Sequence, residues 1–163
     1  MSAKEPIRLY ITHAFKPNEE YSRVFEYLES RDNFYYLNHS DPEKDVSAFT
    51  TEALQEEIRR QISPSEVVIF PAGCYADNPR LMDFILKVCQ AFDKPILGIQ
   101  GHGATINLPK EALEATTETV DWNDRMITDT AKRLARGGGA GELDTVEFDI
   151  SDLDIPEIPK PKN

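Results

Sequence analysis

The sequence has little of several features that would assign a function directly. It has two cysteines, Cys74 and Cys89, which are too few for a disulfide framework and predict reduced thiols. It has no run of 18 apolar residues and no apolar signal-peptide core near its N-terminus, so we expect a soluble cytoplasmic protein without a membrane partner. Phosphate-loop, Gly-x-Ser-x-Gly, Cys-x-x-Cys and His-Glu-x-x-His patterns are all missing, so no metal site or cofactor is predicted.

Basic residues are also scarce relative to acidic ones. The chain has 18 Lys and Arg against 29 Asp and Glu, a formal net charge of −11. Nucleic-acid binding depends on clustered positive charge, so this balance argues against a nucleic-acid partner. A small anionic ligand is still compatible with it, because backbone N–H groups at helix N-termini can hold such a group.

Short apolar runs alternate with segments of helical periodicity. The runs predict strands at 7–12, 33–38, 66–71, 94–100 and 118–122, and the periodic segments predict helices at 18–30, 51–62, 79–92 and 123–136. Asn18 and Asn123 are the expected N-caps of two of these helices. This alternation predicts an α/β flavodoxin-like fold with a five-stranded parallel sheet, order 2-1-3-4-5, and helices on both faces.

The composition changes sharply at Gly137. Residues 137–163 begin with Gly-Gly-Gly-Ala-Gly and continue with seven acids, two lysines and three prolines. We therefore expect a folded domain over 1–136 and a Gly-rich linker with an acidic tail over 137–163. The alternating segment Val-Glu-Phe-Asp-Ile within the tail could add an edge strand or dock on a partner.

In a parallel sheet, ligands bind beyond the carboxyl ends of the strands, near the point where the strand order reverses. All three histidines follow predicted strands and are expected on this one rim. His13 is the candidate acid or base. The candidate nucleotide contacts are Thr12, Ala14, Phe15, Asn38, His39, Ala72, Gly73, Tyr75, Gly101 and His102.

Each candidate also has a purely structural interpretation. His13 could cap a loop, and His39 lies in a stretch where Ser and Asp side chains commonly bond their own backbone. The glycines around His102 fit an ordinary connection equally well. Cys89 is expected in the core, whereas Cys74 lies at the rim.

Four stretches carry a family resemblance: RLYITHAF, SEVVIFPAGCYADNPRLMDFI, DKPILGI and TVDWND. Together they resemble the TIR-like family that includes the Thoeris anti-phage sensor proteins, over about residues 7 to 136. The segment from Ala91 to Ile96 is also similar to nucleoside deoxyribosyltransferases. The resemblance implies a TIR-like fold, NAD as substrate, and cleavage of the nicotinamide–ribose bond to make a signalling nucleotide in phage defence.

This chemistry needs a carboxylate near the ribose, where positive charge develops. In both families that group is usually a glutamate early in the third helix, and the matching position here holds Ile85. No glutamate occurs between Pro71 and Lys110, so Asp83 and Asp77 are the candidate substitutes. Asp83 could instead pair with Lys87 on the surface, and Asp77 could cap the helix.

Three functional hypotheses follow. The first is an NAD glycohydrolase or cyclase that uses Asp83 or Asp77, with His13 and Asn38 holding the nucleotide. The second is a catalytically weak module of the same fold that binds a nucleotide, a protein effector or a phage protein, possesses a docking tail and can form oligomers. A phosphoacceptor receiver domain is the third and least favoured, because the expected acids are missing at the ends of the first and third strands.

Overall fold

The computed structural model describes residues 5–100 and 108–136. Five strands are present in this part of the chain: β1 (Ile7–Ile11), β2 (Tyr36–Asn38), β3 (Val67–Pro71), β4 (Ile96–Ile99) and β5 (Glu118–Val120). The α-helices are α1 (Glu19–Glu29), α2 (Thr51–Ile62), α3 (Pro79–Ala91), α4 (Lys110–Ala115) and α5 (Asp124–Ala135), and a 3-10 helix, η2, covers Ala72–Asp77.

The strands form one all-parallel sheet in the order β2-β1-β3-β4-β5. The predicted α/β flavodoxin-like fold is therefore confirmed. The reversal of strand order falls between β1 and β3, where Leu9 is aligned with Val67. Loops from opposite faces of the sheet diverge at this point, which makes the rim above it the natural place for a ligand.

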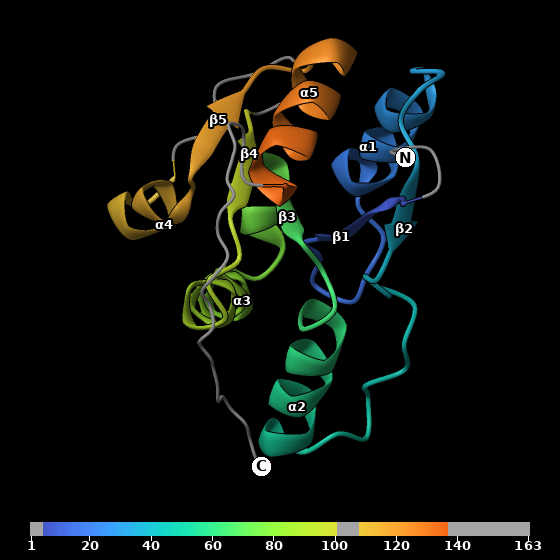
Figure 1. Ribbon diagram of the computed structural model, residues 1–163. Helices are drawn as coiled ribbons and strands as arrows, with labels where there is room; N and C mark the ends of the chain where they lie inside the picture. The colour runs from blue at the N-terminus through green and yellow to red at the C-terminus, as the bar shows by residue number, and fades with distance from the viewer. Residues whose placement is uncertain (1–4, 101–107, 137–163) are drawn as a thin grey trace.

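Helices cover both faces of the sheet (Figure 1). One core cluster joins α1 and α5 to the sheet through residues such as Leu9, Leu28 and Ile127. The other joins α2, α3 and α4 to the opposite face through Tyr10, Ile58 and Ile85. All five residues of β3 are buried, as expected for a central strand covered on both sides.

The helix starts follow local capping chemistry. Asn18 Oδ1 accepts the backbone N–H groups of Glu20 and Tyr21, at 2.8 and 3.2 Å, and Asn123 Oδ1 accepts that of Met126 at 2.9 Å. Both predicted N-caps are thus confirmed. A side-chain acceptor in this position satisfies N–H groups that have no partner within the helix.

Several element boundaries differ from the sequence prediction. β2 starts at Tyr36 rather than residue 33, because residues 32 and 33 form a turn in which the Phe34 N–H bonds to the Arg31 carbonyl. β5 ends at Val120. The helix α4 was not predicted from the sequence. It has only six residues with a single buried side chain, Ala112, so it lacks the apolar periodicity from which a helix is predicted.

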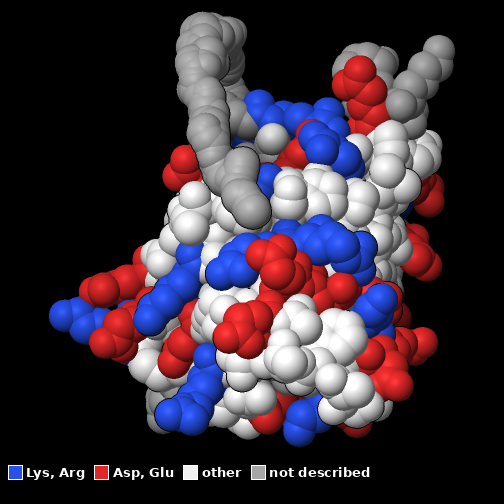
Figure 2. Space-filling model, turned by 90° about the horizontal axis from the view of Figure 1, so that it is seen from below, with Lys and Arg blue, Asp and Glu red and all other residues white. Residues whose placement is uncertain are grey.

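The surface carries charges of both signs. The face seen in Figure 2 mixes Lys and Arg with Asp and Glu, without a broad positive patch of the kind that binds nucleic acid. None of the helices in the described segments is long and apolar enough to cross a membrane.

Candidate functional site

A cleft of about 590 Å³ opens at the carboxyl edge of the sheet, between the loops that follow β1 and β2. It is lined by residues 15–18, Tyr21, Ser22 and 42–47. Lys16 and Lys44 contribute positive charge, and Glu43 and Asp45 contribute an equal negative charge. Tyr21 and Phe15 contribute aromatic surface. The cleft therefore combines groups that can contact phosphates with groups that can contact a base or a ribose.

His13 lies directly below this rim, with only 1% of its surface exposed. Its Nε2 is 3.0 Å from Gln61 Oε1, and its Nδ1 accepts the backbone N–H of Phe15 at 3.2 Å. Phe15 has φ of 59°, a left-handed conformation that is uncommon for a non-glycine residue. One ring nitrogen donates and the other accepts, which is the pattern of a neutral imidazole.

Burial lowers the pKa of His13 from 6.5 to about 4, against the opposing effects of Gln61 and the nearby carboxylates Asp41 and Glu57. The ring is therefore neutral at physiological pH. Because it is also buried and uses both nitrogens, its role in this structure is to hold the loop after β1.

Gln61 joins the loops after β1 and β2. Its Oε1 faces His13 and accepts the N–H of Asp41 at 2.9 Å, while its Nε2 donates to Glu57 Oε2 at 2.8 Å. Sequence analysis missed this residue. The available signal was its helical position, seven residues after Leu54 on the buried face of α2, which also contains Glu57.

A second polar group lies on the wall of the cleft. The hydroxyl of Tyr21 is 2.8 Å from Ser40 Oγ and accepts Asn38 Nδ2 at 3.4 Å. Asn38 Oδ1 also accepts the backbone N–H of Ser40 at 2.9 Å. These contacts order the exit of β2 and leave hydroxyl and amide groups beside the cleft. Asn38, a predicted contact, thus bonds Tyr21 of the cleft but does not line the cleft itself.

The carboxylate of Glu20, which was not predicted from the sequence, lies near the point between β1 and β3 where the strand order reverses. Glu20, in the first turn of α1, accepts the backbone N–H of Gly73 through Oε1 at 2.9 Å. A Cβ atom at residue 73 would come within 2.4 Å of the Glu20 carboxyl carbon, so only glycine allows this approach without a shift. In the sequence, Glu20 looks like an ordinary acid at a positive helix end.

Asp77 lies close to the same point. Its Oδ2 accepts Asn18 Nδ2 at 2.9 Å, and Asn18 in turn caps α1 and lines the cleft. The pKa of Cys74 is raised to about 12, first by burial and then by the negative charges of Asp77 and Glu20. Cys74 is therefore an unreactive thiol at neutral pH, and two carboxylates flank it.

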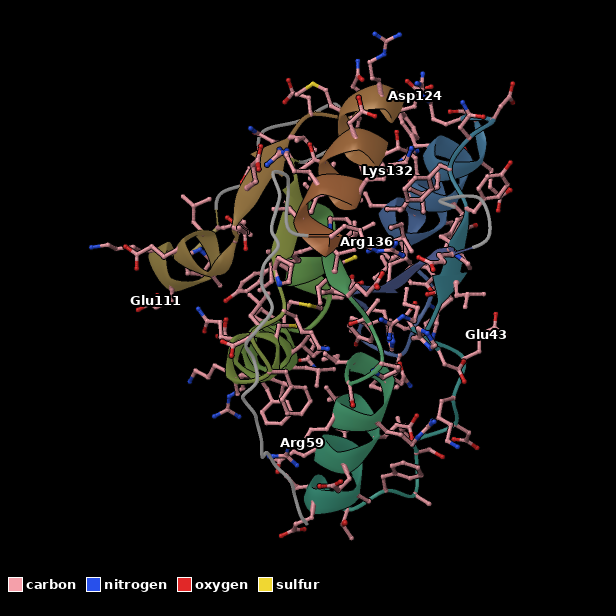
Figure 3. All side chains as sticks on the ribbon, in the orientation of Figure 1. Glu43, Arg59, Glu111, Asp124, Lys132 and Arg136 are labelled. Carbon is pink, nitrogen blue, oxygen red and sulfur yellow. The ribbon has the colours of Figure 1, made fainter. Side chains whose placement is uncertain are left out.

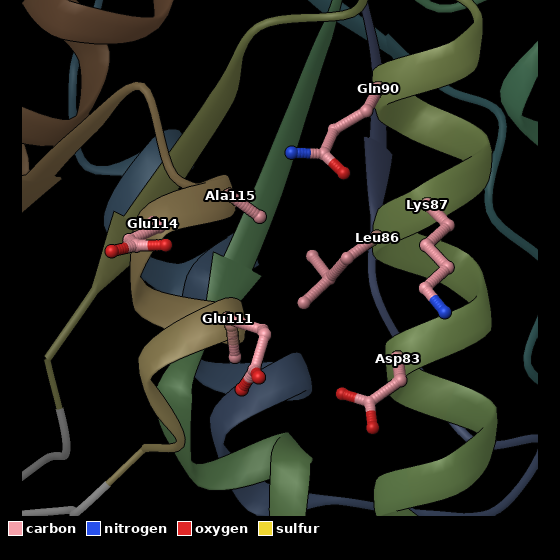
Figure 4. A pocket seen from close by; sticks show the side chains of 8 residues that line it. Asp83, Leu86, Lys87, Gln90, Glu111, Glu114 and Ala115 are labelled. Carbon is pink, nitrogen blue, oxygen red and sulfur yellow. The ribbon is translucent and has the colours of Figure 1, made fainter.

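Asp83 lies elsewhere. It lines a separate cleft of about 510 Å³ between α3 and α4, where it faces Glu111 (Figure 4). Tyr75, a predicted nucleotide contact, donates its hydroxyl to Asp83 Oδ1 at 2.9 Å. Lys87 and Gln90 occupy the α3 side of the same cleft. The structure thus separates the three candidate catalytic side chains. Asp77 is bonded to Asn18 of the first cleft, between the loops after β1 and β2, which we call the rim cleft. His13 lies beneath the rim cleft, and Asp83 lines the other cleft.

The family position of the glutamate is part of the core. Ile85 has no exposed surface and packs with Met82 and Cys89 against the sheet. A carboxylate at this position would be removed from water and from both clefts.

Three of the other predicted contacts, Thr12, Ala14 and Ala72, lie beneath the carboxyl edge of the sheet. Thr12 is fully buried, and its Oγ1 has no hydrogen-bond partner in the described ranges, while Ala14 packs on the α2 and α3 side. Ala72 is buried at the end of β3. The pKa of His39 is lowered by burial and by Arg8. Gly101 and His102 lie outside the described residues.

A search against models of known protein families and a search of curated proteins both found no match for this chain.

Proposed function

We propose that the protein binds a nucleotide in the rim cleft, with NAD as the ligand implied by the TIR-like resemblance, and cleaves the nicotinamide–ribose bond to make a nucleotide signal in prokaryotic anti-phage defence. The observation that carries the proposal is that two carboxylate residues, Glu20 and Asp77, are both hydrogen-bonded to Asn18 of this cleft, Glu20 through its backbone N–H and Asp77 through its side chain, although neither lines the cleft itself. Asn18 connects them, since it lines the cleft, caps the helix of Glu20 and binds Asp77.

The reaction makes modest demands on the protein. The C1′–N bond breaks, its electron pair goes to the nicotinamide nitrogen, and the ring leaves neutral because it was a cation in NAD. No general acid is needed, so a neutral, buried His13 is compatible with the reaction. Positive charge develops on the ribose, and a carboxylate near it lowers the barrier.

A water or a hydroxyl of the nucleotide itself then forms the new bond to C1′ and releases one proton. A carboxylate within hydrogen-bond reach can accept that proton. Glu20 is the better-placed group, because its Oε1 is fixed by the Gly73 N–H near the point where the strand order reverses. In this proposal Asp77 assists by holding Asn18 and by adding negative charge, and Lys16 and Lys44 contact the phosphates.

The test is a chromatographic assay of nicotinamide release from NAD by the purified full chain, with and without a phage-infected lysate. We expect release by the wild type and a loss of about 100-fold or more in Glu20→Gln, the size seen when one group that stabilises a transition state is removed. Asp83→Asn is the matched control, since it also removes one carboxylate, and it should retain activity.

Loss of release in Asp83→Asn with full activity in Glu20→Gln would contradict this assignment and place the chemistry between α3 and α4. No release by folded wild-type protein under either condition would contradict cleavage altogether.

The burial of Ile85 favours a second candidate, a binding module of the same fold with weak or no catalysis. It predicts that NAD or a related nucleotide binds to the rim cleft without turnover, and that signalling proceeds through a protein effector or a phage protein. Equilibrium dialysis with NAD, followed by chromatography of the recovered nucleotide, distinguishes the candidates. Intact bound NAD supports the second, and nicotinamide in the dialysate supports the first.

A further inference from the structure

The outer edge of β2 is open in the part of the chain that the structure describes. There, β2 pairs only with β1, at one end of the sheet. The carbonyl of Tyr35 and the N–H of His39 both bond to β1, so alternation directs the backbone groups of Tyr36 and Asn38 outward. An edge of this kind is a template for a further strand.

Apolar side chains accompany this edge. Tyr35 and Leu37 are 46% and 49% exposed, and their alternation places them on one face of the strand. Tyr36 points the other way, toward the cluster beneath α1 and α5. Tyr35 and Leu37 therefore lie on the same face of the sheet as α2 and α3. These helices cover the neighbouring strands but not the two side chains, which stay exposed.

The chain after α5 starts on the side of the sheet where β1 and β3 begin. Arg136, at the end of α5 (Figure 3), donates through Nη2 to the carbonyls of Glu5 and Pro6, each at 3.2 Å. These residues immediately precede β1, where Ile7 is aligned with Tyr36 of β2. The guanidinium of Arg136 thus reaches the amino-terminal ends of β1 and β3, where it also bonds Glu66, and the tail begins one arginine side chain away from them.

We propose that residues 146–150 of the tail add to the outer edge of β2 as a sixth, parallel strand. The sequence there is Val-Glu-Phe-Asp-Ile, so Val146, Phe148 and Ile150 share one face. In this arrangement they cover Tyr35 and Leu37, while Glu147 and Asp149 point to the opposite side. The Gly-rich residues 137–145 serve as the connection.

Length and chain topology both favour this occupant. The nine residues 137–145 can span up to about 30 Å, whereas the path from β1 to the outer side of β2 is two strand spacings, about 10 Å, which leaves enough chain to cover the distance from the Arg136 backbone to β1 as well. α5 lies on the same face of the sheet as α1. The chain passes from β1 to β2 through α1 in a right-handed crossover. A connection from β5 through α5 to the outer side of β2 runs across the same face in the same direction, so it is also right-handed.

The test is amide hydrogen exchange of the full chain, measured by NMR at Tyr36 and Asn38 in wild type, Phe148→Asp and Asp149→Asn. We expect protection in the wild type, exchange at least about tenfold faster in Phe148→Asp, and no change in Asp149→Asn, since that side chain faces away from Leu37. In addition, Leu37→Ala and Phe148→Ala should give non-additive changes in stability, because the two side chains are expected to touch.

Equal exchange in wild type and Phe148→Asp would overturn the proposal. Protection that increases with protein concentration would assign the edge to a second copy of the chain. Protection that appears only after a partner is added would assign it to that partner, and either result would also overturn the proposal.

Discussion

Acidification should destabilise the fold through His13, and the size of the effect follows from its surroundings. In the folded protein the pKa of this ring is lowered from 6.5 to about 4, chiefly by burial. In the unfolded chain the ring is solvated and its pKa returns to about 6.5. Between these values the unfolded state binds the extra proton and the folded state does not, so stability falls as the pH falls.

A pKa difference of about 2.5 corresponds to about 3 kcal/mol when the pH lies below both values. The contribution is fully present above about pH 6.5 and is lost progressively as the pH falls toward 4. At pH 4.5 most of it is gone, which leaves an expected loss of about 2 kcal/mol relative to pH 7. Burial is the main cause of the lowered pKa, and a proton on Nδ1 would in addition break the hydrogen bond from the Phe15 N–H.

The assay is urea denaturation of wild type and His13→Gln at pH 7 and pH 4.5. Other carboxylates titrate in this range too, but they are common to both proteins, so the difference between the two pH dependences isolates His13. Gln was chosen because its amide can still donate to Gln61 Oε1. We expect the wild type to lose about 2 kcal/mol more than the variant between the two pH values. Parallel losses in both proteins would refute the reasoning.

Three further substitutions test the site and the core. Ile85→Glu should lower the free energy of unfolding by about 4 kcal/mol or more in urea denaturation, because it buries an unpaired charge, and near-wild-type stability would show that the position reaches water. Gly73→Ala should lower the free energy of unfolding by only about 1 kcal/mol, because the Glu20 carboxylate can move away from the new methyl group. The same movement should lower nicotinamide release, and unchanged release would count against a role for Glu20. Asn18→Ala should cost about 1 to 2 kcal/mol through loss of the cap and of its bond to Asp77, measured as a shift in the urea midpoint, and no shift would contradict the capping geometry.

The architecture could be predicted because periodicity and capping act over short ranges of sequence. The apolar run 66–71 contains the central strand, and Asn18 and Asn123 mark two helix starts that the structure confirms. The short helix α4 could not be found in this way, because a single buried Ala112 gives no repeating apolar pattern. In the structure it packs against α3.

The candidate site was less accessible to sequence reasoning, because it depends on contacts between distant parts of the chain. Glu20 and Gly73 are 53 residues apart, and His13 and Gln61 are 48 apart. The sequence placed His13 and Asn38 at the carboxyl edge of the sheet, and both residues lie there. It could not predict that His13 is buried and neutral, or that Asp83 faces α4 rather than the rim cleft.

The central claim is that a nucleotide binds in the rim cleft beside Glu20, and a titration of the isotope-labelled full chain with NAD tests it most directly. We expect NMR amide shifts to concentrate at residues 15–22 and 42–47 and at Gly73, whose N–H is held by Glu20. Shifts confined to Asp83, Lys87 and residues 111–115, or the absence of any shift at millimolar NAD, would contradict the account.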